Sequence, residues 1–353
     1  MHQLNLIYLY SLINSSLAFI WAFLLSVFAI PSIVRVSHQK KILDEPNGRT
    51  IHLSSTPRLG GLAIFAGLLS SLTIFGNLSN GIQYVLAGTS ILFFIGLKDD
   101  IVTVSAFKKF FVQLLASSII LFIGNIRITS FQGMFGIYEI PDGMSYAFSL
   151  ILIIGVTNAI NLIDGLDGLS GTIIIIISAT FGAFFFIYGG SAFGAYGDLA
   201  ICLIGGVAGF LRYNMHKAII FMGDAGSLVC GFIISVMAMK FIEMQPVHTT
   251  PTIALGILFI PLYDTLRVSI SRIIKGKSPF SPDKNHIHHR FIAMGFSQIA
   301  TVFMLALINI SLILFVIFFE KMGMHFELMI IIIFSVILTV ILEMIPRLKK
   351  VPA

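Results

Sequence analysis

The chain is poor in charge and in cysteine. Only 11% of its 353 residues are charged and 57% are hydrophobic, whereas an average soluble protein has roughly 25% charged residues. This balance excludes an ordinary soluble domain and a disordered chain. The two cysteines, Cys202 and Cys230, lie in apolar runs, which excludes a disulfide framework and a zinc ribbon. The class that remains is a polytopic integral membrane protein.

The formal net charge is +6. A basic chain can bind nucleic acid, but membrane proteins also collect Lys and Arg on their cytoplasmic loops. We therefore expect a membrane-lipid environment and no nucleic-acid partner.

Apolar runs of about 15–22 residues recur along the chain, and this is the length that a bilayer requires. The runs lack the alternation of a membrane barrel, so helices are predicted throughout and the fold class is all-α. The eleven predicted spans are 13–34, 59–76, 81–97, 109–125, 146–160, 171–189, 198–212, 225–241, 252–270, 299–319 and 327–345.

The distribution of basic residues predicts the orientation of these spans. With the N-terminus outside and the C-terminus cytoplasmic, 19 of the 22 Lys and Arg residues fall on the cytoplasmic side, which is the side that such residues prefer. Only Arg127, Lys240 and Lys321 stay outside. The chain is then a single transmembrane domain, 1–353, whose polar loops face the cytoplasm. These loops lie near 35–58, 98–108, 161–170, 213–224 and 271–298.

The first polar motif on this side is the pair Asp99 and Asp100, with Lys108 and Lys109 one short loop later. Adjacent carboxylates repel each other unless a cation or a proton offsets their charge. Ionisable groups at a membrane boundary are costly and usually functional. A solvated pair that anchors a helix end is the alternative.

The second motif runs from 158 to 168 and ends an apolar span. It holds Asn158, Asn161, Asp164 and Asp167, with glycines after the two aspartates. Four oxygen-bearing side chains favour a hard cation or a hydroxyl-rich ligand over simple helix capping.

The third motif is Gly223-Asp224-Ala-Gly226-Ser227, directly before an apolar span. Asp224 stands where an N-cap would. A glycine-flanked helix start also suits a phosphate, and a carboxylate beside phosphate is favourable if it holds Mg²⁺. Both interpretations stay open locally.

The fourth motif places His286, His288 and His289 beside Lys284 and Arg290. Zinc is the competing interpretation, but the His-Glu-x-x-His motif is absent. Imidazoles among basic groups favour a site for a diphosphate or a lipid phosphate.

Two further features are less specific. The first cytoplasmic loop, Asp44 to Gly61, is either a binding loop or a polar linker with turn residues. Asp264 and Arg267 lie three residues apart in a predicted helix, so they form either an internal ion pair or a substrate contact.

In this order the motifs resemble one family, the polyprenyl-phosphate N-acetylhexosamine-1-phosphate transferases, and within it the WecA/TagO-like branch. The resemblance runs from Asp44 to about 295. It implies an enzyme of the bacterial cytoplasmic membrane that transfers a sugar 1-phosphate, GlcNAc-1-phosphate above all, from a UDP-sugar to undecaprenyl phosphate and releases UMP. Such a reaction initiates a cell-envelope polysaccharide.

The resemblance also implies roles for individual residues. Asp224 corresponds to the family's Mg²⁺ ligand, with Asn161 as a second contact and Mn²⁺ as a substitute ion. Asp99 and Asp100 correspond to the catalytic acidic pair, and we favour Asp99 as the proton acceptor in a direct in-line attack. Two more aspartates fall where the family binds the donor or the metal: Asp164 and Asp167.

The substrate-binding residues implied by the resemblance carry nitrogen donors. Lys108 or Lys109 holds a phosphate, and the spacing does not decide which. The remaining members are Asn158, His286, His288, His289 and Arg290. UDP-MurNAc-pentapeptide or another UDP-sugar is the alternative donor. A secondary transporter and a zinc protease are the alternatives from other classes, and a homodimer is left open.

Overall fold

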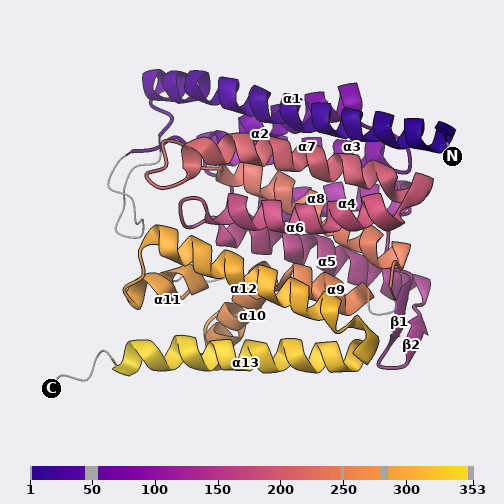
Figure 1. Ribbon diagram of the computed structural model, residues 1–353. Helices are drawn as coiled ribbons and strands as arrows, with labels where there is room; N and C mark the ends of the chain where they lie inside the picture. Colours follow the sequence, from indigo (N-terminus) through magenta and orange to yellow (C-terminus); the bar gives the residue numbers. More distant parts are fainter. Residues whose placement is uncertain (1, 44–54, 248–249, 279–284, 349–353) are drawn as a thin grey trace.

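The computed structural model describes residues 2–43, 55–247, 250–278 and 285–348. The predicted loop motif from Asp44 to His52 and the predicted anion contact Lys284 lie outside these ranges. The long helices run roughly parallel across the view in Figure 1, and α1 begins at the end of the bundle opposite to the one where α13 ends.

The helices are α1 (His2–Lys40), α2 (Gly60–Phe75), α3 (Ile82–Ile101), α4 (Ala106–Ser118), α5 (Asp142–Ile163), α6 (Leu169–Tyr188), α7 (Gly190–Asn214), α8 (Gly223–Met244), α9 (Thr250–Ile257), α10 (Phe259–Ile274), α11 (Ile287–Ala293), α12 (Gln298–Phe318) and α13 (Met324–Leu348). A π-helical turn, η1 (Ile119–Ile123), extends α4, and a 3₁₀ turn, η2 (Glu320–Met322), precedes α13. Two strands, β1 (Ser130–Met134) and β2 (Ile137–Glu139), complete the order.

The helices confirm a polytopic, essentially all-α membrane protein. Within the described ranges nine helices are long and apolar enough to cross a membrane, and the bent pair α9–α10 together passes the same test. The 16-residue α2 is apolar but shorter. Each of the eleven predicted ranges coincides with one of these helices or with the bent pair.

The predicted span 252–270 is not a straight helix. The chain bends by 76° between α9 and α10. Pro261 explains the position of the break, because a proline ring clashes with the carbonyl four residues earlier, here that of Ile257, and offers it no N–H. The buried Asn309 of α12 replaces the missing partners: its Nδ2 donates to the Ile257 carbonyl at 3.4 Å, and its Oδ1 accepts from the Ile260 N–H at 3.3 Å.

The segment 126–145, which connects two of the predicted spans, contains a small antiparallel hairpin. Ser130 pairs with Glu139, and Met134 pairs with Ile137. Gly133 and Gly136 turn the chain with φ of +88° and +77°, a region that glycine enters at no steric cost. The hairpin lies at the end of the bundle opposite to α11 (Figure 1).

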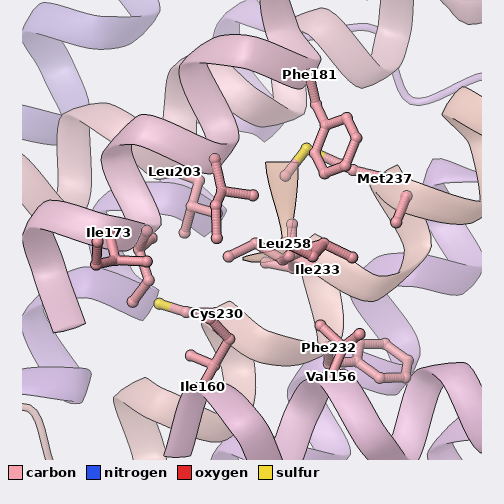
Figure 2. Packing of buried hydrophobic residues seen from close by; sticks show 14 of the residues in the cluster. Val156, Ile160, Ile173, Phe181, Leu203, Cys230, Phe232, Ile233, Met237 and Leu258 are labelled. Atoms are coloured by element: carbon pink, nitrogen blue, oxygen red, sulfur yellow. The ribbon is translucent and has the colours of Figure 1, made fainter. Parts of the chain in front are cut away.

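Helix α8 forms the centre of the bundle. Within its most apolar window, 94% of the residues are buried inside the protein. Figure 2 shows Cys230, Ile233 and Met237 of α8 packed among side chains of α5, α6 and α7. Because lipid tails are as apolar as leucine, such helices are held together by close packing rather than by the hydrophobic effect. Residues at the start of α8 are therefore fixed by neighbours on several sides.

Replacement of Asn309 by leucine should destabilise the protein. The substitution keeps the size of the side chain but leaves the Ile257 carbonyl and the Ile260 N–H unpaired, at a cost of about 1–3 kcal/mol. We expect a lower midpoint of thermal unfolding in detergent. Leu307→Ala, at an exposed position of the same helix, is the control and should change the midpoint little. Equal midpoints for Asn309→Leu and the wild type would contradict the assigned role.

Candidate active site

The two adjacent aspartates at the end of α3 have different partners. Both carboxylate oxygens of Asp100 accept backbone N–H groups from the first turn of α8, those of Asp224 at 2.7 Å and of Ala225 at 3.0 Å. Asp99 accepts the Val104 N–H at 2.6 Å and pairs with Lys109 at 3.3 Å. Asp100 therefore caps α8 from another helix, whereas Asp99 faces the lysine.

Asp224 lies inside the first turn of α8, and the residue at the N-cap position is Met222. The interpretation of Asp224 as the N-cap is therefore wrong, because Asp100 already supplies the acceptor for these N–H groups. The Asp224 carboxylate is turned to other partners. Its Oδ2 lies 2.8 Å from the Lys109 Nζ, and its Oδ1 accepts from the Asn161 Nδ2 at 3.2 Å.

The geometry distinguishes Lys109 from Lys108. Lys109 is partly buried and bridges Asp99 and Asp224. Lys108, the preceding residue on α4, is exposed. Lys109 is therefore the lysine that lies in the site.

Three glycines permit this close assembly. A Cβ at Gly61 of α2 would lie 2.1 Å from the Gly226 backbone nitrogen, and one at Gly96 of α3 would lie 2.5 Å from the Ala225 Cα. At Gly223, where φ is +72°, a Cβ would lie 2.0 Å from the Arg58 carbonyl oxygen. The backbones of α2 and α3 can approach the start of α8 only because these positions lack side chains.

The segment that precedes α2 is part of the same assembly. The Pro57 carbonyl accepts the Phe221 N–H at 2.8 Å, and the Phe221 carbonyl accepts the Gly60 N–H at 2.9 Å. The described part of the loop between α1 and α2 thus pairs with the segment that leads into α8. It also brings Arg58 close enough to act electrostatically on Asp164.

The second motif divides between the site and the scaffold. Asn161 reaches Asp224, and it also donates to the Ser227 Oγ at 2.8 Å. Asn158 instead exchanges amide hydrogen bonds with Gln113 of α4, at 3.0 and 3.3 Å. Asp167 accepts the Ala218 N–H at 3.0 Å and so ties this loop to the chain before α8.

Asp164 follows α5 and accepts a hydrogen bond from Ser170 Oγ at 2.5 Å. Withdrawal from solvent raises the pKa of Asp164 to about 6, and the negative charges of Asp224 and Asp167 add to this effect. The Ser170 hydroxyl and the Arg58 charge lower the pKa. This carboxyl group therefore changes its charge near neutral pH.

The histidine motif lies against the second motif. A Cβ built on Gly165 would lie 2.6 Å from the His288 Nε2. His288 is buried, and neither ring nitrogen has a hydrogen-bond partner within the described ranges. Burial lowers the pKa of His288 to about 3, so its imidazole is neutral. The His289 ring packs on His288, with ring centroids 4.4 Å apart.

The two other members of the motif are held by distant helices. His286 Nδ1 lies 2.8 Å from the Asp264 Oδ2 of α10. Arg290 Nη2 donates to the Asn285 Oδ1 at 3.1 Å and to Glu343 of α13 at 3.3 Å. Asp264 also pairs with Arg267 at 3.0 Å, which confirms the predicted internal ion pair.

Four motifs therefore meet at one end of the bundle. Asp99, Asp100, Lys109, Asn161 and Asp224 form one connected network, and Asp164 and His288 adjoin it through the loop 161–168. Lys108 lies outside this network. Four residues that form hydrogen bonds with the predicted site residues were not singled out from the sequence, because each is a common residue type without a local signal. They are Gln113, Ser170, Ala218 and Glu343.

The chemistry of this network fits a hard divalent cation. The described residues contain no group of three or more His, Cys, Asp or Glu side chains arranged to hold a metal. Mg²⁺ does not need such a cage, because it is usually bound by one or two carboxylates together with substrate phosphates and waters. Asp224 offers a carboxylate, and Asn161 offers an amide oxygen if its terminal amide is rotated, since N and O of an amide are assigned rather than observed.

Comparison with known proteins agrees with the motifs. The sequence model of "Glycosyl transferase family 4" matches residues 82–242. A Bacillus subtilis protein named "Probable undecaprenyl-phosphate N-acetylglucosaminyl 1-phosphate transferase" is 32% identical over 339 residues, which cover 94% of this chain and 92% of the relative. A Mycobacterium leprae decaprenyl-phosphate N-acetylglucosaminephosphotransferase is 29% identical, over 81% of this chain and 79% of the relative. An Escherichia coli O157:H7 undecaprenyl-phosphate alpha-N-acetylglucosaminyl 1-phosphate transferase is 28% identical, over 78% and 77%. This protein belongs to the polyprenyl-phosphate N-acetylhexosamine-1-phosphate transferases of glycosyl transferase family 4.

Proposed function

We propose that this protein transfers N-acetylglucosamine 1-phosphate from UDP-N-acetylglucosamine to undecaprenyl phosphate, yielding a lipid-linked sugar diphosphate and UMP. The observation that carries the proposal is the convergence of Asp99, Lys109, Asn161 and Asp224 from three separate motifs at one end of the helical bundle. The names of the relatives support both the sugar and the polyprenyl phosphate. The product would start a cell-envelope polysaccharide.

The proposed membrane arrangement has eleven crossings, with the N-terminus outside and the C-terminus in the cytoplasm of a bacterium. The excess of Lys and Arg at the end that carries the site supports this orientation. A soluble, anionic donor is made in the cytoplasm and must reach the site from that side.

The orientation can be tested by labelling introduced cysteines in intact cells with a membrane-impermeant maleimide. The native Cys202 and Cys230 are buried, so they should contribute little signal. Ser79→Cys, on the α2–α3 connection, should be labelled, whereas Lys108→Cys should react only after the membrane is opened. The reverse pattern would contradict the proposed topology.

A lipid acceptor also needs an apolar path to the site. A groove of about 780 Å³ lies between α10 and α13, and exposed apolar side chains such as Leu266, Ile270 and Val336 line it. Arg267 also lines the groove, and the same arginine contacts Asp264 and the Asn285 carbonyl. The histidine loop thus borders a surface that suits the hydrocarbon of the bilayer.

Asp224 and Asn161 would hold Mg²⁺ in the proposed reaction. When bound, the ion supplies positive charge to the phosphate oxygens that gather during transfer. Transfer should then be lost on chelation, restored by Mg²⁺, and abolished by Asp224→Asn.

The protein's own residues position the two phosphates. The Lys109 ammonium, which lies between Asp99 and Asp224, can turn to an incoming phosphate oxygen. Asp99 accepts the proton of the lipid phosphate. An oxygen of that phosphate then attacks the sugar-bearing phosphorus of the donor in line, and the bond to UMP breaks as the new P–O bond forms. Asp100 stays on the backbone of α8 and keeps Asp224 in place.

A donor screen tests the proposed function. Membranes that contain the protein are incubated with undecaprenyl phosphate and with each radiolabelled UDP-sugar. We expect label in the lipid fraction with UDP-N-acetylglucosamine. Lipid label only with the muramyl pentapeptide donor would overturn the proposed sugar, and no lipid label with any donor would overturn the reaction.

Lys109 and Lys108 provide a matched pair of variants in the same assay. Lys109→Gln removes a charge directed at the reacting phosphates, so we expect a loss of transfer of about 10²–10³-fold. Lys108→Gln removes an exposed charge one residue away and should retain transfer within about threefold. Similar losses in both variants would show that the site does not distinguish the two lysines.

The raised pKa of Asp164 predicts an acid limb in the pH profile. Transfer should fall as the pH drops through about 6, because the carboxylate that borders the donor site becomes protonated. Ser170→Ala removes a hydrogen bond to the charged form, which should move this limb upward by about one pH unit. Thr172→Val, which removes a hydroxyl from the same helix, is the control. An unchanged limb in Ser170→Ala would rule out Asp164 as its source.

A further inference from the structure

The Asp264 carboxylate of α10 gathers three donors in a buried position. The residue is 2% exposed. Its Oδ1 accepts the Ile287 N–H at 2.7 Å and an Arg267 N–H at 3.0 Å, and its Oδ2 faces the His286 Nδ1 at 2.8 Å. Arg267 also donates to the Asn285 carbonyl at 2.5 Å. Asp264 and Arg267 together therefore hold Asn285, His286 and Ile287, the last of which begins α11.

This arrangement does more than neutralise a buried arginine. One carboxylate oxygen, Oδ1, suffices for the ion pair with Arg267. The other oxygen, Oδ2, is paired with the His286 Nδ1. A second connection, between Arg290 and Glu343, is more exposed, with side chains 20% and 34% accessible. Solvent therefore screens this pair more than it screens the contacts of Asp264. The buried Asp264 is therefore the principal anchor of the histidine motif.

The anchor also determines which His286 nitrogen carries a proton. An ionised carboxylate only accepts hydrogen bonds, so the Nδ1 of His286 must carry a proton. The Nε2 lies on the far side of the ring and is directed away from Asp264. The His286 and His288 rings are nearly parallel, at an interplanar angle of 8° and a centroid distance of 6.0 Å. The His286 ring is thus aligned with the ring that touches the loop 161–168.

We propose that Asp264 is a positioning residue for the transfer reaction: it holds His286 in one orientation and one tautomer, so that the lone pair of the Nε2 is presented to a hydroxyl or amide N–H of the UDP-sugar donor. The proposal rests on the proposed function, since it assigns the His286 Nε2 to the donor of that reaction. An aspartate that orients a histidine in this way acts through the imidazole and does not touch the substrate.

A double-mutant cycle tests the connection between the two residues. Asp264→Asn keeps the side-chain shape but allows the other tautomer, and kcat/KM for the UDP-sugar should fall about 10- to 100-fold. Because Asp264 acts through His286, the double variant with His286→Asn should be no worse than His286→Asn alone, within about twofold. Losses that multiply would overturn the proposal, as would near-normal activity of Asp264→Asn.

Two substitutions of His286 keep the test decisive if Asp264→Asn does not fold. The amide nitrogen of asparagine replaces the Nδ1 and retains the bond to Asp264, whereas the amide of glutamine reaches the position of the Nε2, where its oxygen can accept a hydrogen bond. The proposal predicts more transfer with His286→Gln than with His286→Asn, even if His286→Asn has the higher unfolding midpoint. A purely structural role predicts the opposite order of activity and would overturn it.

Wild-type activity in the same assay separates this proposal from the proposed function. Glu343→Gln, at the more exposed connection, is the matched control and should lower kcat/KM less than about threefold. A loss equal to that of Asp264→Asn would contradict the assignment of the principal anchor. No transfer by the wild type with any UDP-sugar would contradict the function itself, whereas an active wild type with a multiplicative cycle would contradict only the role of Asp264.

Discussion

The first N–H groups of α8 need an acceptor, and Asp100 provides it from the end of α3. A helix start carries partial positive charge, so a carboxylate there is stabilising. The contact requires α3 to lie very close to α8, which Gly96 permits. It also frees Asp224 from capping and turns its carboxylate to Lys109 and Asn161. The geometry of the candidate site thus follows from one helix end that is capped by another helix.

The membrane class and the position of the spans could be predicted from the sequence because bilayer thickness sets the length of each apolar run. The course of α9 and α10 could not. Pro261 lies inside an apolar run, and a single proline is tolerated in membrane helices where neighbours satisfy the freed backbone groups. Here the neighbour is Asn309, which lies far along the chain, and no pattern in the sequence connects it to the break.

The site shows the same limit. Its residue types could be predicted from the chemistry that phosphate and metal binding would require, but two side chains of the same type can have different roles. Asn161 faces Asp224, whereas Asn158, one helical turn earlier, is paired with Gln113. Asp164 borders the network, whereas Asp167 holds the backbone of Ala218. The role of each side chain depends on its partner on another helix. Helix packing, rather than local spacing in the sequence, determines which partner that is.

The position of Lys109 explains how a carboxylate-rich site stays assembled before a substrate arrives. Asp99 and Asp224 would repel each other in a partly buried place unless a cation lies between them, and the Lys109 ammonium lies within 3.3 Å of both. Under the proposed function, an incoming diphosphate would compete for the same ammonium, and the carboxylates would become available for a divalent ion. Under the proposed function, the exchange keeps the charge of the site balanced in both states. A lysine one residue earlier on α4 lies on the exposed side of the helix and cannot make this exchange.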